Sequence, residues 1–282
     1  MKVGFVVLTY NRPDALLAVL QVLAPQCPRD AVVVVADDGS RPEHIEALRR
    51  GLPPFVCPVR HVWHPDVGFT AARSRNLGAV NAQADYVIFL DGDCVPSRHF
   101  LRNHLALAKL GHFVNGSRVL LSERLTHQVL KGECELSSLD FWGWLKLRFS
   151  GDINRLSHLL SWPKAPGRVE TRFRWKSIRS CNFALWYSDL AAVNGFDEAF
   201  NGWGHEDADL VLRLHHQGLS RINGYFGTEV YHLWHRENTR DNEQANRQRV
   251  LDRMHAASSV RAERGLTEAM DAKDVIVTEL NP

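Results

Sequence analysis

Apolar runs alternate with amphipathic segments along the first third of the chain. The apolar runs occupy residues 3–8, 31–36 and 86–90, with a weaker one at residues 58–62. Helical patterns lie between them, at residues 11–23, 43–50 and 69–82. A continuous apolar run is typical of a strand buried on both faces, and strand–helix–strand repeats join parallel strands through right-handed crossovers. The pattern predicts an α/β fold with a mixed, mostly parallel central sheet.

The pattern becomes less regular after residue 98. Helices are expected at residues 100–110 and 206–217, and strands within residues 113–121 and at 182–187. Residues 121–180 have no clean period, whereas the polar segment 242–264 has a helical pattern. We therefore expect one domain over residues 1–240, made of two halves that meet near residue 95, and a C-terminal helical tail over residues 241–282.

Composition and charge exclude several classes of protein. Lys and Arg number 34 against 32 Asp and Glu, so nucleic acid is not an expected partner. No apolar stretch approaches the roughly 20 residues that span a bilayer, and polar residues 9–12 come too early for a signal peptide. The five cysteines are scattered, odd in number and without metal-type spacing, which indicates reduced thiols in a cytoplasmic protein.

Four polar clusters follow predicted strands or open a predicted helix. They are residues 9–12, 37–40, 91–93 and 206–207. Ligands of open α/β sheets collect outside the carboxyl ends of the strands, so we expect these clusters to converge at one edge of the sheet. Asp91 and Asp93 would there seat a hard cation such as Mg²⁺ or Mn²⁺. Both are equally turn residues by type, yet such acids need partners, and no Lys or Arg lies close along the chain.

Two further features have competing interpretations. Asp38 either accepts hydrogen bonds from a nucleobase or ribose, or is a turn-former beside Gly39, and the turn is favoured when this position is taken alone. An arginine of the helix at residues 69–82, Arg73 or Arg75, either reaches a pyrophosphate with its planar fork or lies on a solvated helix face.

A second cluster of candidate residues is Gly202-Trp203-Gly204-His205-Glu206-Asp207. The glycines allow an unusual backbone path, and Trp203 offers a flat apolar face of the kind on which sugars stack. Glu206 and Asp207 open a helix, where the dipole favours acids; an ordinary acidic first turn is the alternative interpretation. Of the later histidines, His232 is the first choice to complete a metal site begun by Asp93, and His235 is the second.

Taken in order, these motifs resemble family-2 glycosyltransferases. The resemblance rests on residues 6–12, 37–40, 75–78 and 89–93. The cluster at residues 202–207 and the later Tyr231-His232 are similar to the acceptor end of beta-galactosyltransferases and bacterial chondroitin-polymerase domains. The whole resemblance covers about residues 3–95 and 180–235, and it implies a Rossmann-like, single-domain A-type glycosyltransferase fold.

The resemblance also implies roles for the donor side. The first half, residues 1–95, would bind a nucleotide sugar, most simply a UDP-sugar, and residues 96–240 would bind the acceptor. The nucleotide-sugar site would comprise Thr9, Tyr10, Arg12, Asp38, Arg75, Asp91 and Trp203. Within it Asp38 would contact the uracil or ribose, and Arg75 would lie near the base or the phosphates.

The same resemblance assigns the metal and the chemistry. Asp93 would bind Mn²⁺ or Mg²⁺ directly, with His232 as a further ligand. Asp207 would be the catalytic base and Glu206 would hold the acceptor. One departure concerns His205, which stands where related transferases often have a small residue, so we expect His205 to alter the choice of acceptor.

The implied activity is an inverting transfer of a hexose or N-acetylhexosamine to a hydroxyl of a glycan or lipid-linked glycan, in bacterial surface polysaccharide or lipopolysaccharide synthesis. A nucleotide-sugar nucleotidyltransferase is one alternative, although residues 9–13 lack its Gly-rich phosphate loop. An inactive nucleotide-sugar-binding module is another, although Asp93, Asp207 and His232 are all present.

The middle segment, residues 121–180, is basic and aromatic and lies outside the resemblance. Residues 141–180 hold nine Lys or Arg against two acids, and they include Trp142 and Trp144. The segment faces either a membrane, as a peripheral contact at the inner face of the cytoplasmic membrane, or a phosphate-bearing glycan acceptor. Ordinary packing beneath a solvated charged face is an equal alternative.

Overall fold

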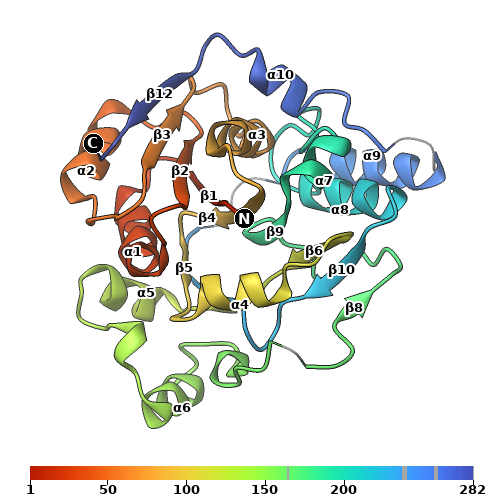
Figure 1. The fold of residues 1–282 in the computed structure, drawn as a ribbon. Helices are drawn as coiled ribbons and strands as arrows, with labels where there is room; N and C mark the ends of the chain where they lie inside the picture. The colour runs from red at the N-terminus through yellow and green to blue at the C-terminus, as the bar shows by residue number, and fades with distance from the viewer. Residues whose placement is uncertain (164, 237–239, 257–259, 282) are drawn as a thin grey trace.

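The computed structural model describes residues 1–163, 165–236, 240–256 and 260–281. Lys164 of the basic segment and residues 257–259 of the tail lie outside the described residues. Within them, the predicted α/β class and mixed central sheet are confirmed (Figure 1). The strands of this sheet, in spatial order, are β12 (Ile276–Glu279), β3 (Val59–Trp63), β2 (Val32–Asp37), β1 (Val3–Thr9), β4 (Tyr86–Asp91), β9 (Asn182–Trp186), β6 (His112–Asn115), β10 (Ser220–Asn223) and β8 (Val169–Glu170).

The parallel part of the sheet comes from the first half of the chain. Strands β3, β2, β1 and β4 run parallel to one another, as the Val-rich apolar runs predict. Strand β9 then runs antiparallel to both β4 and β6. This one reversed strand joins the two halves of the chain in a single sheet.

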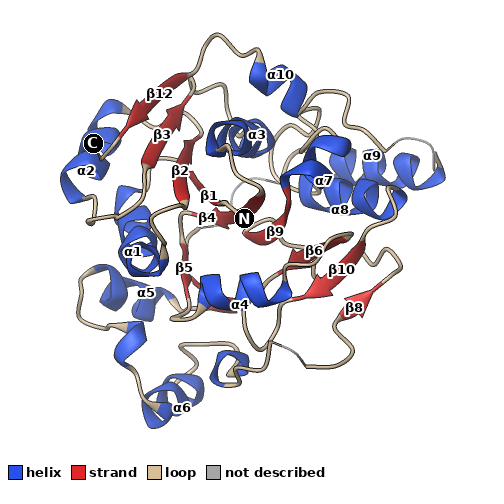
Figure 2. Ribbon diagram, in the orientation of Figure 1, coloured by secondary structure: helices blue, strands red, loops and turns tan. Residues whose placement is uncertain are grey.

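Helices cover both faces of the sheet (Figure 2). The described helices are α1 (Pro13–Leu23), α2 (Pro42–Gly51), α3 (Ala71–Ala82), α4 (Phe100–Leu107), α5 (Glu123–Leu130), α6 (Phe141–Phe149), α7 (Tyr187–Ala192), α8 (Glu206–His216), α9 (Glu243–His255) and α10 (Leu266–Met270). Successive side chains of β1 point to opposite faces, so Phe5 and Val7 pack with α1 and α4, whereas Val6 packs with α3, α7 and α8.

A second, smaller sheet lies beside the carboxyl end of β4. It contains β5 (Cys94–Pro96), β11 (Glu229–His232) and β7 (Ser117–Leu120). The strand expected within residues 113–121 is present, but the segment holds two strands, β6 and β7, that belong to different sheets. The break is at Gly116, where a Cβ atom would lie 2.1 Å from the Asn182 side chain, so only glycine fits this crossing.

The C-terminal tail is not wholly helical, which corrects the sequence-based expectation. It contains α9 and α10, but it ends in β12, which pairs antiparallel with β3 at the edge of the central sheet. Ile276 and Val277 of this strand are both exposed, so no alternation of buried and exposed residues announced it. The middle segment also has local structure that its sequence did not predict, namely α5, α6 and short 3₁₀ turns. Among the described helices, none is both long and apolar enough to cross a bilayer.

The edge strand generates a stability prediction. Asn281 Oδ1 accepts a hydrogen bond from Val59 N at 2.7 Å, and its Nδ2 donates to Cys57 O at 2.8 Å. Asn281→Ala leaves both half-enclosed backbone groups without these partners, so we expect a loss of about 1–3 kcal/mol in the free energy of unfolding, measured by urea denaturation. Glu279→Ala, which breaks only a partly exposed ion pair with Arg60, should cost at most about 1 kcal/mol. Equal effects of the two variants would contradict a structural role for this end.

Candidate active site

Three strand ends meet at one edge of the central sheet. The register pairs Thr9 of β1 with Asp37 of β2, and Leu8 of β1 with Asp91 of β4. The polar residues that follow these strands therefore lie next to one another in space. This is the edge at which open α/β sheets bind their ligands.

Asp38 is buried among groups of the protein itself. Its carboxylate accepts hydrogen bonds from Thr70 N at 2.9 Å and from Ser74 Oγ at 2.7 Å, and His64 Nε2 lies 3.2 Å away. These contacts hold the turn after β2 against the first turn of α3. The expected contact of Asp38 with a uracil or ribose stays a prediction.

The turns after β1 and β2 are joined by residues that the sequence analysis did not single out. Asn11 adopts a positive φ of 51°, which asparagine tolerates better than most residues. Its N–H donates to Ser40 Oγ at 2.8 Å, and its Oδ1 accepts from Arg41 N at 2.9 Å. Asp37 accepts from Ser40 N and pairs with His61 Nε2, both at 2.8 Å. The available signal was Asn11 itself, a residue that tolerates positive φ, within the first strand-end cluster.

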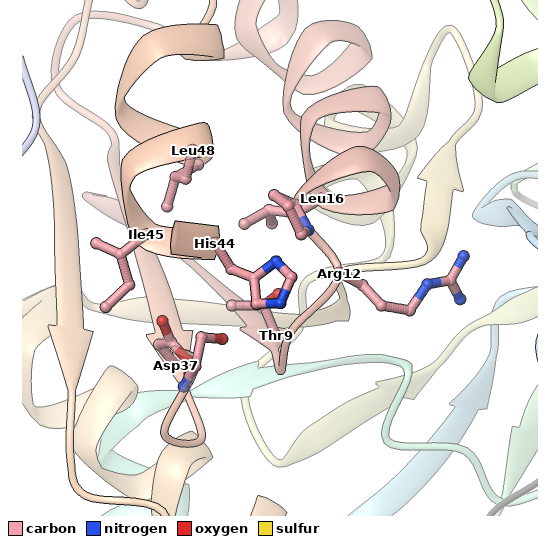
Figure 3. Close-up of a pocket in the computed structure, with 9 residues that line it drawn as sticks. Thr9, Arg12, Leu16, Asp37, His44, Ile45 and Leu48 are labelled. Carbon is pink, nitrogen blue, oxygen red and sulfur yellow. Dashed lines mark hydrogen bonds between the residues drawn. The ribbon is translucent and has the colours of Figure 1, made fainter. Parts of the chain in front are cut away.

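A small pocket lies beneath these two turns (Figure 3). It is lined by Thr9, Asp37 and His44 among others, and its volume of about 10 Å³ suits one water molecule at most. The Arg12 side chain extends away from this pocket. Tyr10 is 47% exposed and donates its hydroxyl proton to Asp66 at 2.9 Å, so one aromatic ring stands at the rim of the site.

Arg75 connects the two polar clusters that the sequence analysis treated separately. Its Nη2 donates to Asp91 Oδ1 at 2.9 Å and its Nη1 to Glu206 Oε1 at 3.1 Å, and the guanidinium is buried. Burial acts to lower the pKa of Arg75, but the carboxylates of Asp91 and Glu206 outweigh it and raise that pKa above its usual value. The expected contact of Arg75 with the base or phosphates stays a prediction, because both donor sides described here are engaged by carboxylates.

The acids after β4 thus find partners far away along the chain. Asp91 pairs with Arg75 of α3, and Arg12 Nη1 lies 3.8 Å from Asp93 Oδ2. The lack of a Lys or Arg close to these acids along the chain therefore did not indicate whether they form ion pairs in the folded protein. Arg73, the other arginine considered on α3, pairs instead with Asp274 at 2.6 Å on the outer side of the helix.

Asp93 and His232 are the centre of a candidate metal site, and His235 lies beside the other carboxylate oxygen of Asp93 as an alternative partner. Asp93 Oδ1 lies 3.7 Å from His232 Nε2, and Asp93 Oδ2 lies 3.4 Å from His235 Nε2. Two atoms that each lie about 2.1 Å from one ion are separated by roughly 3–4 Å, so both distances fit shared coordination. The β11–β5 register pairs His232 with Cys94, the residue after Asp93, and this explains the proximity.

The chemistry of the donors suits a hard cation. Burial lowers the pKa of His232, although Asp93 opposes the shift, so the imidazole is neutral and has a free lone pair. Cys94 is close enough to join the group. Burial raises the pKa of the Cys94 thiol well above its usual range, however, and a protonated thiol is a poor ligand. The residues present fit Mn²⁺ or Mg²⁺ held by carboxylate and imidazole groups.

Glu206 and Asp207 open α8 after a strained turn. His205 has a left-handed φ of 72°, and Gly202 and Gly204 also have positive φ. Asp207 Oδ1 accepts from Ala208 N at 2.7 Å, and the Ser180 N–H also donates to this carboxylate. Burial raises the pKa of Asp207 and of Glu206, and the neighbouring positive Arg75 opposes both shifts.

Trp203 lies just before this turn and is 37% exposed. The Arg240 guanidinium lies 4.8 Å from the centre of its ring, so the indole takes part in a cation–π contact. Stacking of Trp203 on a sugar stays a prediction. The same edge of the central sheet therefore carries a metal-type donor set, a pair of acids and exposed aromatic rings.

Comparison with known proteins identifies relatives of this chain. The model of glycosyl transferase family 2 matches residues 5–154, and that of the N-terminal domain of galactosyltransferase matches residues 167–236. A validoxylamine A glucosyltransferase of Streptomyces hygroscopicus subsp. limoneus is 31% identical over 223 residues, 76% of this chain and 48% of the relative. Chondroitin synthase of Escherichia coli is 27% identical over 81% of this chain and 34% of its own length. The chain thus spans half or less of these relatives.

Solved structures agree at the level of fold. S. aureus TarS 1–349 in complex with UDP has a TM-score of 0.56 at 14% identity, over 95% of this chain and 68% of that one. Mannosyltransferase PcManGT from Pyrobaculum calidifontis, in complex with GDP-Man and Mn²⁺, has a TM-score of 0.54 at 16% identity over the same shares. The fold is therefore that of A-type glycosyltransferases, as predicted. With a family model that covers more than half of its residues, the chain belongs to glycosyl transferase family 2.

Proposed function

We propose that this protein is an inverting glycosyltransferase that moves a hexose or N-acetylhexosamine from a UDP-sugar to a hydroxyl of a glycan acceptor. The observation that carries the proposal is the Arg75 bridge, because it holds the donor-side acid Asp91 and the acceptor-side acid Glu206 in one cluster. Family membership and the UDP complex of a protein with the same fold support the donor class.

The donor lies across the strand ends in this proposal. Thr9, Tyr10 and Arg12 line the nucleotide pocket, with the exposed Tyr10 ring free to stack on the base. Asp38 and Asp91 lie at the ribose of the donor. Asp38 acts either by direct contact with the ribose or by fixing the turn after β2 that contacts it. Arg12 carries positive charge toward Asp93, the position where the diphosphate and its cation belong.

Asp93 and His232, with His235 as the alternative, hold the divalent cation. When bound, Mn²⁺ or Mg²⁺ supplies Lewis acidity that stabilises the negative charge of the leaving nucleoside diphosphate. The Mn²⁺ in the complex of PcManGT, a protein of the same fold, supports this assignment.

Asp207 removes the proton of the attacking hydroxyl. A carboxylate is a weak base in water, but burial raises the pKa of Asp207 and so strengthens it toward neutral pH. Glu206, held by Arg75, orients the acceptor hydroxyl, and Trp203 packs against a sugar ring. A single base attacking from the face opposite the leaving group inverts the anomeric carbon, so an α-linked donor gives a β-linked product.

The acceptor is a glycan or lipid-linked glycan of bacterial surface polysaccharide or lipopolysaccharide synthesis. Similarity to chondroitin synthase, a polysaccharide-forming enzyme, supports this class of acceptor. A nucleotidyltransferase or an inactive nucleotide-sugar-binding module is less well supported, since a base candidate and a metal-type donor set lie together.

Helix α6 gives the protein a surface suited to a membrane. Trp142 and Phe149 are 71% and 82% exposed, and the spacing of Trp142, Leu145 and Phe149 puts them on one side of the helix beside Lys146. Buried Trp144 stacks on Tyr231 of β11 at 5.0 Å, which ties α6 to the strand that carries His232. Peripheral contact of this face with anionic lipid at the inner side of the cytoplasmic membrane would bring a lipid-linked acceptor to the site.

The base assignment predicts the effect of one conservative change. Asp207→Asn should lower kcat by about 10²–10⁴-fold because the proton acceptor is lost, while UDP affinity measured by calorimetry stays unchanged. The pH profile of kcat/KM should fall toward acid with a midpoint above the usual pKa of an aspartate, because Asp207 must be ionised and burial raises its pKa. Exposed Asp271→Asn is the matched control. Near-normal turnover of Asp207→Asn would rule out this role.

The metal assignment predicts a loss of ion-dependent nucleotide binding. Asp93→Ala and His232→Ala should each weaken Mn²⁺-dependent UDP binding at least about tenfold, since direct ligands matter no less than their second-shell partners. Calorimetry with Mn²⁺ and with chelator measures the effect, and exposed His127→Ala is the control. A larger loss in His235→Ala than in His232→Ala would assign the ligand role to His235 instead of His232. A UDP affinity that chelator leaves unchanged would rule out the metal site.

The α6 surface predicts lipid binding that depends on its aromatic residues. The wild-type protein should float with vesicles that contain phosphatidylglycerol at moderate salt, and Trp142→Ser/Phe149→Ser should reduce the floating fraction several-fold. Leu110→Ser, which replaces an equally exposed apolar side chain elsewhere, should leave flotation unchanged. If the wild-type protein stays at the bottom of the gradient, α6 is not a membrane contact.

A further inference from the structure

Three arginines gather around the segment that leads from the middle of the chain into β9. Arg118 lies on β7, and its Nη1 is 4.0 Å from Cys181 Sγ. Arg179 lies two residues before Cys181, and its N–H donates to Asn115 Oδ1 at 3.1 Å. Arg155 is held near the end of β7 by its neighbour Asn154, whose Oδ1 accepts a hydrogen bond from Leu120 N at 3.0 Å. All three side chains are half-buried.

These arginines differ from the other enclosed arginines of the chain. Arg213 pairs with Asp209, Arg253 with Asp197, and Arg221 with Glu170. Within the described residues, by contrast, Arg118, Arg155 and Arg179 form no ion pair with a carboxylate. Asp207 acts on Arg179 and Asp91 acts on Arg118, but only from beyond ion-pair distance. A group of half-buried like charges without a direct counter-ion is typical of a site that receives an anion.

The electrostatics of Arg179 support the same picture. Burial lowers the pKa of Arg179, and the positive charges of Arg118 and Arg155 lower it further. Arg118 and Arg155 therefore both lie close enough to Arg179 to repel it. A bound phosphate or carboxylate would remove that repulsion and match the planar donor fork of each arginine.

The segment that carries Arg179 also touches both halves of the candidate active site. The Ser180 N–H donates to the Asp207 carboxylate, and Cys181 O accepts from Asp91 N at 3.3 Å. The cluster thus adjoins the proposed base and comes entirely from the half of the chain expected to bind the acceptor. The exposed Tyr10, which marks the nucleotide side, belongs to a different loop, between β1 and α1.

We propose that Arg118, Arg155 and Arg179 form an anion subsite that binds a phosphate or carboxylate group of the acceptor, next to the hydroxyl that Asp207 deprotonates. This inference rests on the proposed function and narrows it to acidic acceptors. It also gives the basic segment a task inside the active site, separate from the lipid surface of α6. The other source of such an anion is the donor diphosphate, and the experiment distinguishes the two.

The test measures binding of small probes rather than turnover. Full-length protein is saturated with UDP and Mn²⁺, and glucose 1-phosphate, glucuronic acid and neutral glucose are titrated by ligand-observed NMR. At least one acidic probe should bind more tightly than glucose. Arg179→Gln and Arg155→Gln should each weaken it by about tenfold, as expected for loss of a charged hydrogen-bond donor. Arg179→Lys should recover part of the affinity, and exposed Arg172→Gln should have no effect.

The outcomes separate the possible sources of the anion. Acidic probes that bind only when UDP is absent would assign the arginines to the donor diphosphate and overturn the proposal. Equal binding of acidic and neutral probes, or no effect of either glutamine variant in protein that melts at the wild-type temperature, would overturn it as well. Because no sugar is transferred in this assay, its result is independent of whether Asp207 acts as the base.

Discussion

The active-site cluster depends on one buried cation between two carboxylates. Arg75 leaves the face of α3 that packs against the sheet, and it reaches Asp91 at the end of β4 and Glu206 at the start of α8. Breaking a buried ion pair by removal of one partner is costly, because the remaining charges lose their counter-ion. Here the loss of Arg75 would leave Asp91, Glu206 and Asp207 as uncompensated neighbours. The guanidinium therefore holds Asp91 and Glu206 in place, and its charge opposes the rise that burial causes in the pKa of Glu206 and Asp207.

The remaining structure serves to bring these elements together. The parallel strands β1, β2 and β4 end at one edge, and antiparallel β9 attaches the second half of the chain beside β4. Asn182, at the start of β9, accepts from buried His104 at 2.9 Å and donates to Ser117 O at 3.0 Å. This network links α4, β7 and β9. The small sheet can then present His232 to Asp93 across the β11–β5 pairing.

The sequence was sufficient for the strands and helices whose period is strong. The apolar runs that became β1, β2 and β4, and the helices α1 and α8, were predicted because burial on both faces or on one stripe leaves a clear pattern. Strand β12 was not predicted, since an edge strand with exposed Ile276 and Val277 has backbone pairing but no buried face. The split at Gly116 was also missed, because it is due to the Asn182 side chain, which is distant in sequence.

The candidate site was predictable in residue type more than in contact. Asp91 and Asp93 were predicted because they are acids at the end of an apolar strand. The Arg75 bridge, the internal partners of Asp38 and the arginines around Cys181 arise from tertiary packing. Each depends on side chains that meet only when the sheet has formed. Motif spacing alone therefore places the candidate residues at the sheet edge and leaves open what each one touches.

The most direct measurement is a crystal structure of this protein soaked with UDP and Mn²⁺, with the ion located by its anomalous signal. The account predicts one Mn²⁺ bound by Asp93 and a histidine of residues 232–235, with the diphosphate on the ion and Asp207 facing the open side of the same cleft. An ion or nucleotide bound elsewhere, with Asp207 on a separate surface, would contradict the account.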